Sequence, residues 1–277
     1  MVTEPIDLHH QGATRVIGSY LLDTEDGPAL HDCGPSTCVD ALKAGLRERG
    51  LELTDVRHLL LSHIHLDHAG AAGVLVREHP GLQVHVSEIG APHLVDPSRL
   101  EASARRLYGD VFDPLWGELA PVPEENVHVV GARVLGFDCF PSPGHASHHV
   151  VYVGADGTAY SGDAAGVRIQ PHDLVLPPAP PPEFDLAAWQ RTIDEIERRD
   201  PNALALIHFG VARNPMKHLE QLRARLDEWT AIVAGGASLE EFEAAVGGKS
   251  SDEYDRAMPL WQSYAGLKRW AEKRRAA

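Results

Sequence analysis

One histidine-rich stretch decides how the rest of the chain is interpreted: Ser62-His63-Ile64-His65-Leu66-Asp67-His68. It follows the apolar residues 57–62 (RHLLLS), which predict a buried strand that runs directly into this stretch. Its HxHxDH spacing places three imidazoles and one carboxylate close together, and four such groups at a strand end are costly to bury unless they find partners. Because neutral imidazole and carboxylate are ligands that Zn²⁺ accepts, the stretch predicts a metal site.

The residues on either side alternate between β-rich and helical segments. Strands are expected over 15–22 and 28–32, joined as a hairpin by Asp26-Gly27, and then over 83–86, 126–130, 133–140, 148–154, 158–161 and 203–207. Helices are expected after Pro35 as far as Gly50, over about 69–79, weakly over 88–120, and over 185–199, 215–234, 238–246 and 252–274. This alternation predicts an α/β protein whose sheets are covered by helices.

A long loop over 166–185 interrupts that alternation. It contains six prolines, namely Pro171, Pro177, Pro178, Pro180, Pro181 and Pro182. A loop of this length inside a compact chain is usually the wall or lid of an active site, and a rigid spacer is the alternative.

Composition and charge exclude several classes of protein. The 277 residues include 25 Lys and Arg against 40 Asp and Glu, a formal net charge of −15, which argues against a protein that binds along nucleic acid. The first eleven residues have no apolar core of a signal peptide, and no apolar run is long enough to span a bilayer. With only three cysteines, the expected location is the cytoplasm, with no membrane contact. The 17 histidines are scattered and not clustered at a terminus, so they are not a purification tag.

Four further segments complete a pattern that resembles the metallo-β-lactamase superfamily. Three of them follow predicted strands, and the fourth contains an early aspartate: Pro143-Gly144-His145, Ser161-Gly162-Asp163, Leu206-Ile207-His208-Phe209-Gly210 and His31-Asp32-Cys33-Gly34. All elements of the family's pattern are present in order, and together they cover residues 15–210. The resemblance implies a four-layer αββα sandwich over 1–214, followed by a C-terminal helical extension over 215–277 that packs on it.

The resemblance also implies a set of metal ligands. His63, His65 and His145 would bind a first ion, Asp67, His68 and His208 a second, and Asp163 would bridge the two. The expected cofactors are two divalent ions, with zinc first and iron or manganese as alternatives. A shared carboxylate relieves the repulsion between two such ions, and the pair lowers the pKa of a bridging water.

Further residues are assigned to the surroundings of the ions. Asp67 is the catalytic candidate, because besides binding metal it could orient the attacking hydroxide or accept its proton. Asp32 and His148 are expected to contact metal-binding side chains and orient them, without binding metal themselves. His172 in the proline-rich loop, and the basic residues Lys268 and Arg269, are candidates for substrate binding. For the basic residues the alternative is a solvated helix whose cations complement its dipole.

The superfamily performs several reactions, so the fold alone does not fix the function. True β-lactamases are disfavoured because no signal peptide is present. Flavin-linked di-iron members are disfavoured because the set of histidines is complete. Nucleases are disfavoured because the sequence has no RNA-binding insertion. The remaining expectation is a hydrolase in the style of glyoxalase II or the lactonases, in which a metal-bridging hydroxide attacks the carbonyl of a small thioester, ester or lactone.

Two alternatives stay open beside this hydrolase. A mononuclear iron dioxygenase that oxidises persulfides would share the motifs, and a phosphodiesterase of the same fold is also possible. Some lactonases carry a tyrosine shortly after the bridging aspartate, whereas Ala164-Ala165-Gly166 stands here, which weakens the lactonase interpretation. The expected partner is a small-molecule substrate, with no nucleic acid, and a homodimer is possible.

Overall fold

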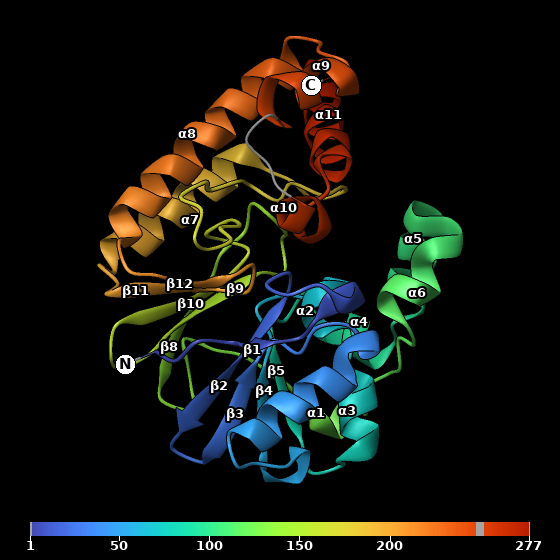
Figure 1. The fold of residues 1–277 in the computed structure, drawn as a ribbon, viewed down its shortest axis with the longest axis vertical. Coiled ribbons are helices and arrows are strands. Elements are labelled where there is room, and N and C mark those ends of the chain that lie inside the picture. Colours follow the sequence, from blue (N-terminus) through green and yellow to red (C-terminus); the bar gives the residue numbers. More distant parts are fainter. Residues whose placement is uncertain (1, 248–251, 277) are drawn as a thin grey trace.

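Two six-stranded sheets packed face to face form the centre of the computed structural model, which describes residues 2–247 and 252–276 (Figure 1). Side chains from both sheets contribute to one hydrophobic cluster between them. Tyr20 of the first sheet donates a hydrogen bond to the carbonyl of Leu206 in the second, at 3.0 Å. The expected αββα sandwich of the metallo-β-lactamase type is confirmed in its two sheets with helices outside them.

The first sheet has the order β1-β2-β3-β4-β5-β6. Its strands are β1 (Ile6–Asp7), β2 (Gly18–Thr24), β3 (Gly27–His31), β4 (His58–Leu60), β5 (Gln83–Val86) and β6 (Val127–Val129). The expected hairpin is present as β2 and β3, and β3 to β6 run parallel. β4 is buried on both faces, as its continuous apolar sequence requires. The helices between these strands include α1 (Val39–Glu48), α2 (Leu66–Ala69), α3 (Ala72–Glu78) and α4 (Ala91–Val95).

The second sheet has the order β12-β11-β10-β9-β8-β7. Its strands are β7 (Arg133–Val134), β8 (Phe137–Pro141), β9 (Val150–Val153), β10 (Thr158–Gly162), β11 (Ala203–Leu206) and β12 (Gly210–Ala212). The helix α7 (Leu186–Arg198) connects the parallel pair β10 and β11, and the side chain of Asp185 caps it by accepting the N–H of Ala188 at 2.8 Å.

The C-terminal part is helical, as expected, and it shares a core with the second sheet. Its helices are α8 (Pro215–Ala234), α9 (Leu239–Val246), α10 (Asp252–Ala257) and α11 (Leu260–Ala276). Leu222 of α8 and Leu267 of α11 lie in the same hydrophobic cluster as Trp189 of α7. The division at residue 214 therefore stays a prediction about sequence organisation, and within 215–277 the positions 248–251 and 277 lie outside the described residues.

Two expected elements are each divided in the structure. The strand predicted over 133–140 is the hairpin of β7 and β8, because Leu135 and Gly136 both have positive φ, at 49° and 86°, as a tight two-residue turn requires. The helix predicted over 252–274 is α10 and α11, with Met258 and Pro259 between them, because proline disfavours helical backbone at the residue before it.

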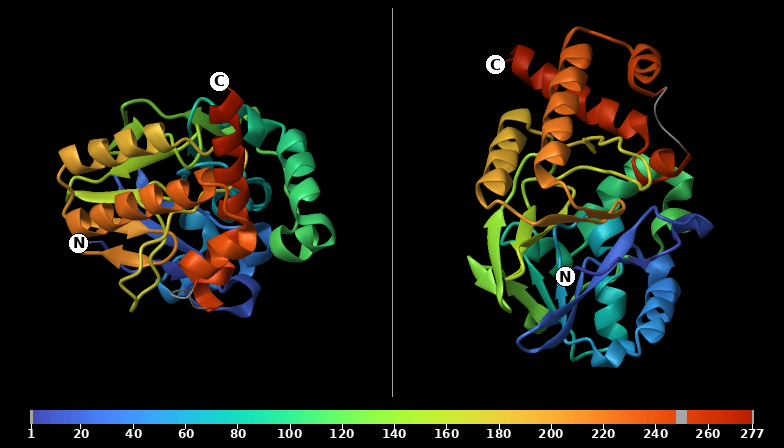
Figure 2. Two further views of the ribbon diagram at one scale, coloured as in Figure 1. Left: turned by 90° about the horizontal axis from the view of Figure 1, so that it is seen from above. Right: turned by 60° about the vertical axis from the view of Figure 1, so that its left-hand side comes forward.

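A short helical arm projects beside the sandwich and faces the C-terminal helices. It consists of α5 (Ser98–Tyr108) and α6 (Phe112–Trp116), and Figure 1 shows it in green, with α10 above α2. Figure 2 shows the same arm and α11 near one another in the view from above. Short 3-10 turns lie at His10–Gly12, Ser36–Cys38, Leu53–Asp55, Gly109–Val111 and Glu124–Asn126. Within the described residues, the helices are all too short or too polar to cross a bilayer.

Candidate functional site

The residues of the sequence motifs meet where several strands end between the two sheets. The histidine-rich stretch leaves β4 and enters α2, while the turn containing His145 follows β8. Asp163 follows β10 and His208 follows β11. The turn before His145 needs a glycine: Gly144 has a φ of 137°, and a Cβ there would lie 2.3 Å from the backbone of Trp189 in α7.

Three imidazoles form the first group of possible ligands. His63 Nε2 lies 3.0 Å from His65 Nδ1 and 3.2 Å from His145 Nε2, and the last two nitrogens are 2.9 Å apart. Three mutually close ring nitrogens repel one another when their lone pairs converge, and a cation removes that repulsion. This group therefore suits a metal ion.

A second group lies beside the first, with a carboxylate between them. Asp67 Oδ2 is 3.5 Å from His68 Nε2 and 3.4 Å from His208 Nε2. The two oxygens of Asp163 face different groups. Its Oδ2 is 3.4 Å from His145 Nε2, and its Oδ1 is 3.4 Å from His68 Nε2 and 3.6 Å from His208 Nε2. One carboxylate thus faces both groups of possible ligands.

Backbone carbonyls fix the orientation of two of these imidazoles. His145 Nδ1 lies 2.7 Å from the carbonyl oxygen of Pro178, and His208 Nδ1 lies 2.6 Å from that of Val16. Because a carbonyl only accepts, each Nδ1 must carry the proton, and in the neutral ring the inward-facing Nε2 then holds a lone pair. Such contacts behind a ligand are typical of histidines that bind metal.

Asp32 fixes the other side of the site through a small buried network. Its Oδ1 accepts a hydrogen bond from the N–H of Ser62 at 2.7 Å. Its Oδ2 accepts one from the Ser62 hydroxyl at 2.7 Å and one from Nδ1 of His68 at 2.8 Å. The Ser62 oxygen in turn lies 2.9 Å from Nδ1 of His63. Asp32 therefore orients one imidazole directly and one through a hydroxyl, and these contacts support its predicted role.

Two buried atoms in this cluster have no hydrogen-bond partner among the described residues. They are His68 Nε2 and Asp163 Oδ1. Buried polar atoms are rarely left without a partner, since that costs about 1–3 kcal/mol each. A cation between them would satisfy both, so the donors present fit divalent metal.

The electrostatics of the cluster agree with this fit. Burial lowers the pKa of His63 and His65 well below the usual value, and neighbouring imidazoles lower both further, so these rings are neutral as ligands must be. Burial acts in the same direction on His68, but the carboxylates of Asp67 and Asp163 outweigh it and raise its pKa well above the usual value. Positive charge is therefore favoured beside the carboxylates, whether a proton or a metal ion supplies it.

Two consecutive histidines after the Pro-Gly-His turn support the site from outside. The ring of His148 stacks at 5.9 Å on that of His63, its Nδ1 accepts the N–H of Ile64 at 3.4 Å, and burial lowers its pKa to about 4. His149 belongs to the segment 148–154 that was predicted as a strand, and its ring also stacks on His63, at 4.8 Å. Its Nε2 accepts the N–H of Asp163 at 3.1 Å. The signal that could have identified His149 is its position next to the ligand turn.

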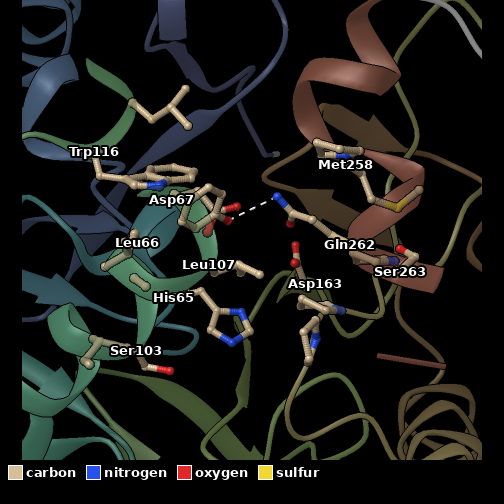
Figure 3. A pocket seen from close by; sticks show the side chains of 18 of the residues that line it. His65, Leu66, Asp67, Ser103, Leu107, Trp116, Asp163, Met258, Gln262 and Ser263 are labelled. Atoms are coloured by element: carbon tan, nitrogen blue, oxygen red, sulfur yellow. Dashed lines mark hydrogen bonds between the residues drawn. The ribbon is translucent and has the colours of Figure 1, made fainter. Parts of the chain in front are cut away.

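A cavity of about 780 Å³ opens from the site, and Figure 3 shows His65, Asp67 and Asp163 facing into it. Its other lining comes from the proline-rich loop, from the arm of α5 and α6, and from residues 255–263 of the C-terminal part. Loop 166–185 was expected to form a wall or lid of the site and does line the cavity, and the C-terminal part lines it as well. The structure does not bring His172, Lys268 or Arg269 into it: His172 lies against Tyr254, and Lys268 lies over Tyr264.

Comparison with known proteins gives consistent matches. A family model described as the metallo-beta-lactamase superfamily matches residues 15–208. The uncharacterized protein YobT of Bacillus subtilis is 23% identical over 216 residues, which cover 74% of this chain and 88% of YobT.

Solved structures agree with the fold. The metallo-beta-lactamase family protein TTHA1429 of Thermus thermophilus has a TM-score of 0.70 at 20% identity, covering 94% of this chain and 89% of its own. The superfamily protein ST1585 of Sulfolobus tokodaii has a TM-score of 0.66 at 19% identity, and the match covers 97% of this chain and 96% of ST1585. TTHA1623, solved in a di-iron-bound form, has a TM-score of 0.56 at 24% identity, and the match covers 81% of this chain and 98% of TTHA1623.

Proposed function

Since the chain belongs to the metallo-β-lactamase superfamily, we propose that it is a hydrolase with two divalent metal ions that cleaves a small thioester, ester or lactone. Members of this superfamily are mostly metal-dependent hydrolases, and the His and Asp cluster suits divalent metal ions. The observation that carries the proposal is the position of Asp163, whose two oxygens face different groups of possible ligands.

The proposed ligands form two sets of neighbouring side chains, one for each ion. His63, His65 and His145 would hold one ion, while Asp67, His68 and His208 would hold the other. Asp163 would contact both. When bound, such a pair supplies a coordinated water of lowered pKa and a Lewis acid for the substrate carbonyl.

The chain's own residues would prepare the reaction around that pair. The imidazoles of His68 and His208 lower the pKa of Asp67 well below its usual range, although burial opposes this, so its carboxylate is ionised at neutral pH. That carboxylate is partly exposed and lines the cavity, where it is placed to accept a proton from the attacking water. Asp32 and His149 hold His63, His68 and the turn of Asp163 in position.

Zinc is the proposed metal, with iron or manganese as alternatives. The di-iron form of TTHA1623 is a property of that protein, but a histidine and carboxylate set of this kind accepts either metal. A mononuclear iron dioxygenase needs only two histidines and one carboxylate, whereas this chain brings five histidines and two aspartates together. Because such dioxygenases share these motifs, the ligand set alone does not decide between the two functions, and the metal content and oxygen uptake of the purified protein do.

The test is a substrate screen of the purified protein with and without metal. We expect hydrolysis of at least one chromogenic thioester, ester or lactone, a loss of kcat of at least about 100-fold after chelation, and recovery with added Zn²⁺. Activity only on phosphodiesters would assign the phosphodiesterase alternative. Oxygen uptake with a persulfide and no hydrolysis would refute the proposal.

A further inference from the structure

The cavity beside the proposed metal site has two apolar walls that come from distant parts of the chain. Leu66, Leu107 and Trp116 form part of one wall, next to the histidine-rich stretch. Met258 and Pro259, between α10 and α11, form part of the opposite wall. Figure 3 shows Leu66, Leu107 and Trp116 on one side of this space and Met258 on the other. Its volume of about 780 Å³ lies within the ~300–1,000 Å³ typical of pockets that enclose a small molecule.

The rim of the cavity carries exposed apolar side chains. Leu107 and Trp261 are each 37% exposed and Val111 is 53% exposed, and all three line the cavity. Single exposed apolar residues are ordinary, but three that line the same cavity make its opening more apolar. This opening leads to the proposed metal site, because His65, Asp67 and Asp163 line the same space.

A hydrogen bond joins the two walls across the cavity. The side-chain amide of Gln262 in α11 donates to the hydroxyl oxygen of Tyr108 in α5 at 3.2 Å, which is the dashed line in Figure 3. The indole of Trp116 is held by the ring of His10, which stacks on it at 5.5 Å with an interplanar angle of 16°. The hydrogen bond therefore links the two walls, and the ring stack supports one of them.

Polar and charged side chains also line the cavity beside the apolar walls, among them Arg99, Ser103 and Arg256. The Tyr108 hydroxyl oxygen accepts from Gln262, so its own proton remains to be donated to a bound molecule. An apolar wall beside such polar groups suits a molecule that has an apolar part and a polar end.

We propose that the substrate carries a bulky apolar chain or ring, which binds between the arm of α5 and α6 and the C-terminal helices while its carbonyl reaches the metal site. This inference rests on the proposed hydrolase function and names its substrate class. The driving force is burial of the apolar group, since a fully buried methylene improves binding about fourfold.

The first test compares short and long substrates on the metal-loaded protein. We would measure kcat/KM for acetyl and octanoyl thioesters of N-acetylcysteamine, and for δ-valerolactone and δ-dodecalactone. The long member is expected to exceed the short one by about 100-fold in at least one series, because the added methylenes are buried. Equal values, or a preference for the short member, in both series would overturn the proposal.

Matched variants locate the effect in this cavity. Leu107→Asp places a charge at the rim and should reduce the preference for the long substrate at least about tenfold. Val129→Asp is the control, because Val129 is an equally apolar, 55% exposed residue of β6 outside the cavity lining. Equal loss of the preference in both variants, or retention in both, would contradict the assignment.

A binding measurement separates this inference from the proposed function. If no substrate is hydrolysed, the hydrolase proposal fails, and calorimetric titration of the purified protein with octanoate and acetate then decides the inference alone. Octanoate binding that is at least about tenfold tighter than that of acetate, and weakened by Leu107→Asp but not by Val129→Asp, would support the apolar cavity. Equal binding of octanoate and acetate would overturn it.

Discussion

At the scale of single residues, most of the candidate site follows from motif spacing, and the rest depends on packing. The seven proposed ligands could be selected from the sequence because each lies in a short motif at a predicted strand end. His149 could not, because a sequence does not tell which of two adjacent histidines turns toward Asp163. Asp32 adopts a φ of 57°, which is costly for a residue with a side chain and is stabilised here by its hydrogen bonds to Ser62 and His68.

His218 gives a prediction for the pH dependence of stability. It is a buried residue of α8, its Nε2 donates to the carbonyl of Ala165 at 2.7 Å, and burial lowers its pKa to about 4. In the unfolded chain this imidazole takes up a proton near pH ~6.5, so between these values the unfolded state binds more protons. The free energy of unfolding should therefore fall as the pH falls from about 6.5 toward 4.

The measurement is urea unfolding of wild type and His218→Gln at pH 7 and pH 5. Wild type should lose about 2 kcal/mol more than His218→Gln between these two pH values. His172→Gln replaces an exposed histidine and should behave as wild type does. An identical loss in wild type and His218→Gln would show that His218 does not titrate as described.

At the scale of elements, long amphipathic and capped segments could be predicted closely, whereas short ones could not. The helix expected over 215–234 is α8, which begins with the side chain of Asn214 accepting the N–H of Lys217 and with Pro215 in its first turn. β1 and β12 have only two and three residues, too few for a periodic pattern, and they exist because neighbouring strands pair with them. The breaks at Leu135 and at Pro259 are local turn signals inside otherwise continuous patterns.

The contact between α11 and the proline-rich loop gives a prediction at this scale. Gly266 packs directly on the loop, and a Cβ there would lie 2.0 Å from the carbonyl oxygen of Ala179. Gly266→Ala should lower the free energy of unfolding by about 1–3 kcal/mol through overpacking, although alanine normally favours a helix over glycine by about 1 kcal/mol. Urea unfolding at neutral pH measures the change. A gain in stability would mean that the close contact does not exist.

Gly131→Ala is the matched control for that substitution. A Cβ at Gly131 has no atom within 4 Å of it, so the change should stay within about 0.5 kcal/mol. A larger effect in the control than in Gly266→Ala would contradict the account of α11 packing.

At the scale of the whole molecule, the site is assembled from both sheets and closed by segments distant in sequence. The first sheet supplies the histidine-rich stretch, and the second supplies His145, Asp163 and His208. The cavity over them depends on contacts such as that between Tyr108 and Gln262, which no local pattern predicts. This explains why the sequence indicates the reaction centre but not the apolar walls that we propose select the substrate.

In the proposed site, Asp163 and two groups of ligands hold a pair of metal ions. Elemental analysis of the purified chain, compared with its Asp163→Ala and His145→Ala variants, tests this most directly. We predict about two zinc or other divalent ions per chain in wild type, and loss of at least one ion in each variant. Two tightly bound ions retained in both variants, or a single iron per wild-type chain, would contradict the binuclear site.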